Sequence, residues 1–120
     1  MNAILSITPQ FVEEIIAGNK LYEYRKSIFK QHVEKVYIYA SAPVSRIVGE
    51  FQPADILSGK PDAIWEKTCD YAGISKRFYN DYFAGRTVAY AIAIQNLKIY
   101  ETPKLLPLHA PQSFRYVGYL

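Results

Sequence analysis

Cysteine and long apolar stretches are scarce in this sequence of 120 residues. The single cysteine, Cys69, cannot form an intrachain disulfide, which is typical of proteins in a reducing cytosol. No apolar run approaches the roughly 20 residues that a membrane-spanning helix needs. The first residues, Met1 to Ser6, lack a basic region followed by a long apolar stretch, so no signal peptide is expected. We therefore expect a cytoplasmic protein without a membrane partner.

The signatures of several common chemistries are also absent. The chain has neither a glycine-rich phosphate loop ending in Lys-Ser/Thr nor a dinucleotide-binding fingerprint. His32, His109 and Cys69 are scattered without the spacing of metal ligands, and no motif supports a Ser-His-Asp triad. No metal and no cofactor are therefore expected. Cys69 falls on the apolar side of an expected helix and is interpreted as a small core residue.

The composition is that of one globular domain covering residues 1–120. Hydrophobic residues make up 50% of the chain and charged residues 21%, which is near the average for folded domains. The net charge is +3, and the stretch from Lys20 to Lys35 alone holds five cations against Glu23 and Glu34. A local basic patch of this kind favours an anionic ligand. Lysines that only keep a surface strand and loop hydrated are the alternative for Lys26, Lys30 and Lys35.

Hydrophobic periodicity and turn residues predict six strands and three helices, an α+β architecture without repeats or linkers. Gly49, inside one of the strands, predicts a bulge or a close backbone approach. The aromatic residues of the second and third helices are interpreted as core or lid in preference to a stacking platform for bases. The expected strands are Ala3–Ile7, Lys20–Arg25, Val33–Ala40, Ser45–Phe51, Arg86–Tyr100 and Phe114–Tyr119; the helices begin at Pro9 after a Thr8 cap, at Pro61, and after a Ser75 cap, and stop at Gly18, Gly73 and Gly85.

Three ionisable residues stand close together just after the first helix. Because side chains alternate along a strand, Glu23 and Arg25 point the same way, about 6–7 Å apart, so the carboxylate can orient the guanidinium. Lys20 has the opposite parity, but a bulge or loop conformation at the start of the strand would turn it inward. The alternative to a binding site is that these three residues form a salt-bridge ladder on the surface of an edge strand, which would contribute little to stability.

These residues carry a family resemblance. The pattern Gly-x-Lys-x-x-Glu-x-Arg, present as Gly18, Lys20, Glu23 and Arg25, resembles the signature of the ASCH domain, a small β-barrel family related in fold to the PUA RNA-binding domain. The resemblance implies a PUA-like mixed β-barrel of about six strands with three short helices. Three further segments look familial and follow in the expected order over nearly the whole chain: Val36–Pro43, Ile47–Phe51 and Pro111–Tyr116.

The resemblance also implies a cleft between the first helix and the barrel. There Arg25 or Arg115 would grip a phosphate, and Glu23 or Glu50 would accept from an exocyclic amine. Capping and packing of the last strand is the alternative for Ser113 and Arg115, and Glu50 is equally compatible with a solvated strand position. The residues expected to meet at the cleft are Lys20, Glu23, Arg25, Ser41, Glu50, Gln112, Ser113 and Arg115.

Two classes of function follow from the resemblance. The first is a module that binds RNA or a nucleotide in a basic cleft. The second is an enzyme, either an amidohydrolase on acylated cytidine or a ribonuclease, with Lys20 as base or nucleophile and Glu50 as its acid/base partner. The amidohydrolase type resembles Lys-x-x-Thr-x-Arg, whereas this chain has Glu23, which would keep Lys20 protonated. Binding is therefore ranked above catalysis; a regulatory domain for another small anion or a protein is a third reading. The identity of the ligand and the oligomeric state stay open.

Overall fold

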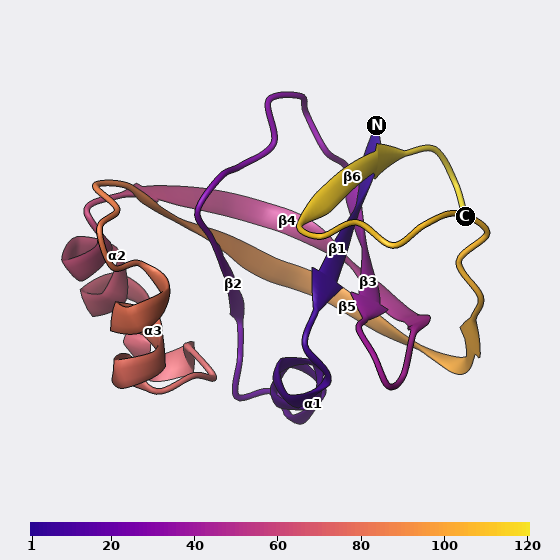
Figure 1. Ribbon diagram of the computed structural model, residues 1–120, viewed down its shortest axis with the longest axis horizontal. Coiled ribbons are helices and arrows are strands. Elements are labelled where there is room, and N and C mark those ends of the chain that lie inside the picture. Colours follow the sequence, from indigo (N-terminus) through magenta and orange to yellow (C-terminus); the bar gives the residue numbers. More distant parts are fainter.

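Six strands form one curled sheet in the computed structural model, which describes residues 1–120 (Figure 1). The strand order is β2-β5-β4-β3-β1-β6, with β1 and β3 parallel and the other neighbours antiparallel. The predicted α+β fold, a mixed barrel of about six strands with three short helices, is confirmed, and its sheet is curled into a half-barrel. The elements are β1 (Asn2–Ile7), α1 (Pro9–Ala17), β2 (Tyr22–Arg25), β3 (Lys35–Ala40), β4 (Arg46–Gly59), α2 (Pro61–Thr68), a 3₁₀ turn (Cys69–Tyr71), α3 (Lys76–Tyr82), β5 (Ala89–Lys104) and β6 (Phe114–Val117).

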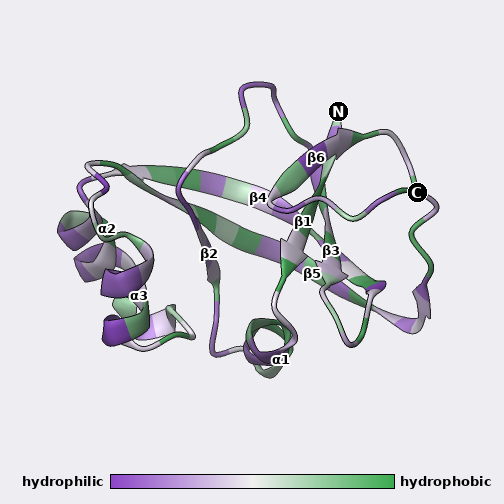
Figure 2. Ribbon diagram, in the orientation of Figure 1, coloured by the Kyte–Doolittle hydropathy of each residue, from purple (hydrophilic) through white to green (hydrophobic).

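The main core lies on the inner, concave side of the curled sheet. Alternation along each strand decides which residues reach it: Leu5 on β1 and Ile38 on β3 point inward, while Ile4 and Tyr37 pack on the opposite face. Figure 2 shows this alternation of hydrophobic and hydrophilic residues along the strands. Helix α1 covers the inner side with Val12 and Ile15. Burial of these apolar surfaces is the main stabilising term of the domain.

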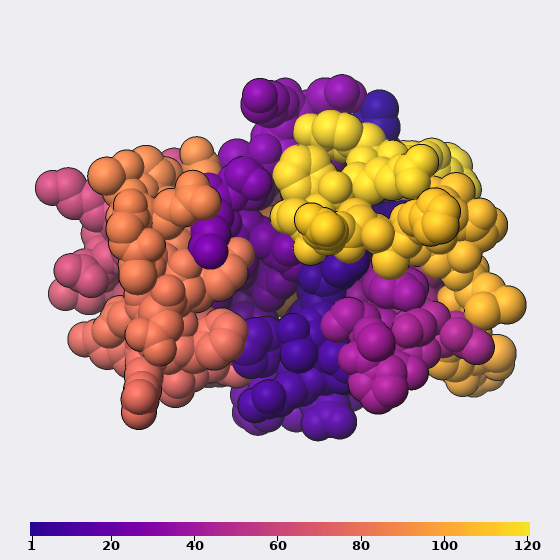
Figure 3. Space-filling model, viewed as in Figure 1, coloured from indigo at the N-terminus to yellow at the C-terminus, as the bar shows by residue number.

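Residues 61–82, called here the helical cap, close one end of the sheet. Tyr79 of this cap and the adjoining Phe83 pack with Ile64 against Tyr24 of β2. They also contact the predicted small-residue strip of β5, represented by Ala89 and Ala91, whose short side chains let the helices approach closely. In Figure 3 the cap, in salmon and orange, lies against the indigo surface of α1. The cap and α1 therefore form two walls over the start of β2.

The helix boundaries follow the predicted signals with two differences. The Ser75 hydroxyl accepts a hydrogen bond from the Phe78 N–H at 3.0 Å, which confirms the predicted cap, whereas the Thr8 side chain makes no such bond.

The prediction for Cys69 was wrong: its thiol is exposed, because the helix tightens into a 3₁₀ turn at this residue and rotates it outward. No helix combines the length and apolarity needed to cross a membrane.

The sheet does not close on itself, because β2 and β6 are its two ends. The chain between β2 and β3 crosses the open side and packs on β6: the Phe29 ring meets the Phe114 ring edge-on at 5.0 Å. The Tyr116 hydroxyl accepts hydrogen bonds from the Lys30 and Gln31 N–H groups at 2.7 and 3.2 Å. These contacts hold the two ends of the sheet at a fixed distance.

The close approach predicted at Gly49 is present. A Cβ atom at this position would lie 2.5 Å from the Lys98 carbonyl oxygen on β5, and the β3–β4 register shifts beside it. We expect Gly49→Ala to lower the free energy of unfolding by about 1–3 kcal/mol, since backbone must move. Gly59→Ala on the same strand is the matched control, because its Cβ would meet only Ile64 at an ordinary 3.7 Å. Urea denaturation of both variants checks the difference; equal stabilities would contradict it.

Candidate functional site

The backbone after α1 turns Lys20 into the protein. The helix ends at Gly18, and the N–H groups of Asn19 and Lys20 then both donate to the Glu14 carbonyl. Lys20 pairs with Ala72 in an isolated bridge and does not join β2. This irregular start of the strand gives Lys20 the inward orientation expected from the sequence, and the residue is only 1% exposed.

The buried ammonium of Lys20 is held by polar and aromatic groups. Its Nζ donates to the Ala72 carbonyl at 3.0 Å and lies 3.6 Å from Glu23 Oε1. The ring centroids of Tyr24 and Phe11 are 4.8 and 5.5 Å away, within the range of cation–π attraction. Burial lowers the pKa of Lys20 from its ordinary value; Glu23 opposes this shift and Arg25 adds to it.

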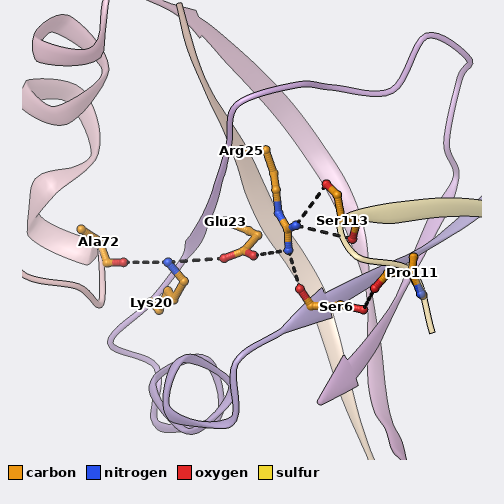
Figure 4. A network of polar contacts seen from close by, with 7 residues as sticks. All are labelled: Ser6, Lys20, Glu23, Arg25, Ala72, Pro111 and Ser113. Atoms are coloured by element: carbon orange, nitrogen blue, oxygen red, sulfur yellow. Dashed lines mark hydrogen bonds and ion pairs between the residues drawn. The ribbon is translucent and has the colours of Figure 1, made fainter. Parts of the chain in front are cut away.

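Glu23 joins Lys20 to Arg25 (Figure 4). Arg25 Nη2 donates to Glu23 Oε2 at 2.7 Å and to the Ser6 carbonyl of β1 at 2.8 Å. Its Nη1 lies 3.5 Å from both the carbonyl and the hydroxyl of Ser113, just before β6. The buried Nε of Arg25 has no partner. Arg25 therefore bridges one end of the open sheet to the other and keeps one donor unused.

A hollow of about 150 Å³ lies beside these groups, between α1, β2 and α3. Lys20, Glu23 and Arg25 contribute its charged wall. The remaining wall is mostly apolar or aromatic, so charges in the hollow are weakly screened. Besides the three charged residues, the lining consists of Ser6, Ile7, Thr8, Phe11, Tyr24, Ile74, Phe78 and Tyr82.

Two more of the predicted site residues lie near this hollow. Ser113 contacts Arg25 through the two long Nη1 contacts. Ser41, in the turn after β3, donates its backbone N–H to the carbonyl of Ile7, a residue that lines the hollow. Of the predicted residues, Lys20, Glu23 and Arg25 line the hollow and Ser113 contacts Arg25. Ser41 does not line the hollow, but it is hydrogen-bonded to Ile7, which does.

The structure does not bring Glu50, Arg115 or Gln112 to the hollow. Glu50 accepts a hydrogen bond from the Tyr100 hydroxyl at 2.7 Å and pairs with Lys35 at 3.0 Å. Gln112 and Arg115 are exposed. Glu50 is the register partner of Tyr37, and Arg115 that of Ile4. Register partners point to the same face of a sheet, so both residues lie on the face opposite the inner core.

Several contributors to the site were missed by sequence reasoning. The Ala72 and Ser6 carbonyls act through backbone atoms, for which the side-chain pattern has no signal. Phe78 and Tyr82 were interpreted as core or lid, yet they line the hollow, and Phe78 is 46% exposed. No group of three or more His, Cys, Asp and Glu side chains is placed to hold a metal ion.

Gly73 makes room for Lys20 under the cap. Its φ is +67°, and a Cβ atom there would overlap Lys20 Cβ. Gly85, whose φ is +77° and where an added Cβ atom would have no neighbour within 4 Å, is a matched control for backbone strain alone. We expect Gly85→Ala to cost about 1–2 kcal/mol of unfolding free energy and Gly73→Ala about 1–3 kcal/mol more. Chemical denaturation measures both; a Gly73 variant no less stable than the Gly85 variant would contradict the packing of Lys20.

The lowered pKa of Lys20 gives stability a definite pH dependence. Between that pKa and the ordinary value of 10.5, the unfolded chain binds the Lys20 proton and the folded chain does not, so this residue makes stability rise with pH. Buried tyrosines act oppositely above about pH 10; burial raises the pKa of Tyr79, for example, to about 12. Lys20→Met removes only the first effect.

We therefore expect the unfolding free energy of the wild type to increase relative to that of Lys20→Met as the pH rises toward 10.5. The tyrosine contributions are common to both proteins and cancel in the difference. Denaturation at a series of pH values checks the sign. A difference that shrinks with rising pH would mean that the Lys20 pKa is raised, not lowered.

Comparisons with known proteins point to one family. An ASCH domain-containing ribonuclease of Zymomonas mobilis is 30% identical over 95 residues, covering 78% of this chain and 64% of that protein. Large ribosomal subunit protein uL22 of Ureaplasma parvum is 30% identical over 89 residues, covering 71% of this chain and 29% of that protein. The chain thus spans less than two thirds of the length of either curated relative. No protein-family model matches the chain.

Solved structures agree with the first of these relatives. The crystal structure of ASCH from Zymomonas mobilis superposes with a TM-score of 0.89 at 26% identity, covering 98% of this chain and 87% of that one. A tyrosine-to-phenylalanine variant of the same protein gives a TM-score of 0.89 at 25% identity, with coverage of 98% and 90%. With the Gly-x-Lys-x-x-Glu-x-Arg residues gathered at one site, the chain belongs to the ASCH domain family.

Proposed function

We propose that this chain is an RNA-binding domain that holds part of a nucleotide in the hollow beside Lys20, Glu23 and Arg25. The observation that carries the proposal is the charged wall of the hollow, where Lys20 and Arg25 outnumber Glu23 and Arg25 keeps a buried Nε without a hydrogen-bond partner. An unpaired buried donor is unfavourable unless a ligand satisfies it. We place the domain in the cytoplasm, where the exposed thiol of Cys69 would stay reduced.

The charges at the hollow favour a phosphate. Lys20 and Arg25 together carry one more charge than Glu23 neutralises, and Lys26 adds a cation whose Nζ lies 4.6 Å from the centroid of the Tyr82 ring. A phosphate oxygen can accept from the Lys20 ammonium and from the Arg25 guanidinium while Arg25 Nη2 keeps its bond to Glu23. The aromatic part of the lining offers a base a stacking surface.

The size of the hollow restricts what enters it. Pockets for drug-sized ligands usually measure about 300–1,000 Å³, whereas this hollow measures about 150 Å³. A single base or a single phosphate therefore fits inside, and the rest of the nucleotide lies outside. This arrangement suits recognition of one unit of a longer RNA better than enclosure of a free nucleotide.

Cleavage of RNA is a second candidate function, favoured by the Zymomonas mobilis relative described as a ribonuclease. Burial lowers the pKa of Lys20 from its ordinary value, which favours the neutral amine that a general base needs. Lys20 could then take the proton of a ribose 2′-hydroxyl as its oxygen attacks the adjacent phosphorus. The bond from phosphorus to the 5′-oxygen breaks, and Lys20 returns the proton to that oxygen. Glu50 lies on the opposite face of the sheet and cannot serve as the acid/base partner of Lys20. No observation favours the amidohydrolase.

Lys20→Met tests the proposal directly. We expect the affinity for a short fluorescent RNA, measured by anisotropy, to fall at least about tenfold, since one of two buried cations is lost. The variant should fold, because Glu23 keeps its 2.7 Å bond to Arg25. For the wild type, affinity should fall as salt rises. Loss of cleavage with binding retained in the variant would favour the ribonuclease reading.

Lys98→Met is the matched control, because Lys98 lies on β5 and does not line the hollow. It should bind RNA within about twofold of the wild type. Equal affinity for the wild type and Lys20→Met, with no loss of cleavage in the variant, would show that RNA does not use the hollow. A wild type that binds neither RNA nor nucleotides would refute the proposed function.

A further inference from the structure

The hollow continues into a second depression, called here the α1–α3 groove. This groove measures about 480 Å³ and shares Phe11, Ile74 and Phe78 with the hollow. It lies between α1 and the start of α3, whose Phe11 and Phe78 rings are in contact. A chain whose one unit sits in the hollow would thus have its neighbour at the groove.

Phe78 separates the hollow from the groove. It is 46% exposed, unlike Tyr79 and Phe83 on the same segment, which are buried against the sheet. The Phe11 ring meets it edge-on at 5.1 Å, and the Tyr82 ring is nearly parallel to it, at 11°. A large aromatic side chain is therefore fixed in orientation by two neighbours while about half of it remains accessible. This is the arrangement of a stacking platform for a base.

The polar lining of the groove differs in charge from that of the hollow. It contains no lysine or arginine; its polar groups come from Gln10, Glu14, Asn19 and Ser75. The Asn19 amide donates to Glu14 Oε2 at 3.1 Å, which orients the carboxylate. A carboxylate repels phosphate and accepts hydrogen bonds from the exocyclic amines of bases. The groove therefore suits the base of a nucleotide and disfavours its phosphate.

We propose that the α1–α3 groove is a second nucleotide subsite. The base next to the one at the hollow stacks on Phe78 there, and its exocyclic amine donates a hydrogen bond to the Glu14 carboxylate. The subsite takes adenine, cytosine or guanine in preference to uracil, which has no exocyclic amine. This inference rests on the proposed function, because the phosphate of the same RNA is held at Lys20 and Arg25.

Anisotropy with fluorescent pentaadenylate and pentauridylate tests the subsite. Phe78→Ala should weaken the binding of both oligonucleotides by about 5- to 150-fold, because stacking on an aromatic ring is tolerant of sequence. Phe78→Tyr, which keeps the ring, should bind as the wild type does. Glu14→Ala should weaken pentaadenylate severalfold and leave pentauridylate unchanged, whereas Glu13→Ala, an exposed neighbour outside the groove, should change neither.

The outcomes distinguish failure of the subsite from failure of the proposed function. If the wild type binds neither oligonucleotide, the proposed function fails and the subsite with it. If the wild type binds but Phe78→Ala and Glu14→Ala bind equally well, the subsite is refuted while the hollow stands. Circular dichroism checks that Phe78→Ala is folded; should it not be, Phe78→Leu fills the volume without a ring and must show the same loss.

Discussion

One buried carboxylate, that of Glu23, pairs with two buried cations and thereby connects three parts of the molecule. Through Lys20 it reaches the Ala72 carbonyl in the helical cap, and through Arg25 it reaches the Ser6 carbonyl of β1 and the segment before β6. A curled sheet with two unpaired ends has no backbone hydrogen bonds to close it. Here a guanidinium spans that gap, so the position of the cap, the ends of the sheet and the hollow all depend on one ionic chain.

Stability alone does not explain this chain of charges. Removing several charged groups from water is costly, and well-packed apolar residues of similar volume usually stabilise a protein as well or better. In this site the lowered pKa of Lys20 and the unpartnered Nε of Arg25 are both signs that the folded state bears such a cost. Perturbed groups of this kind concentrate at functional sites. A ligand that satisfies Nε would stabilise the folded domain, and the stabilisation would grow with the ligand concentration.

The sequence could predict the local part of this site and not the part that depends on register. Strand alternation put Glu23 and Arg25 on one face, and turn chemistry identified the Ser75 cap and the crowded Gly49. Alternation within a strand cannot say which face of the sheet that strand turns inward, so Glu50 and Arg115 could not be assigned to the opposite face. The partner of Lys20, the Ala72 carbonyl, lies 52 residues away and carries no side-chain signal.

The contacts of Arg25 decide how a ligand can enter without dismantling the site. Nη2 is fully used, by Glu23 at 2.7 Å and the Ser6 carbonyl at 2.8 Å, and the second bond ties β2 to β1. Nη1 has only the long contacts to Ser113 at 3.5 Å, and Nε has none. An acceptor that replaces the long Ser113 contacts at Nη1 gains a charge-assisted hydrogen bond, while the ion pair of Nη2 with Glu23 stays in place. One nitrogen of the Arg25 guanidinium thus ties the strands together, while another stays able to bind a ligand.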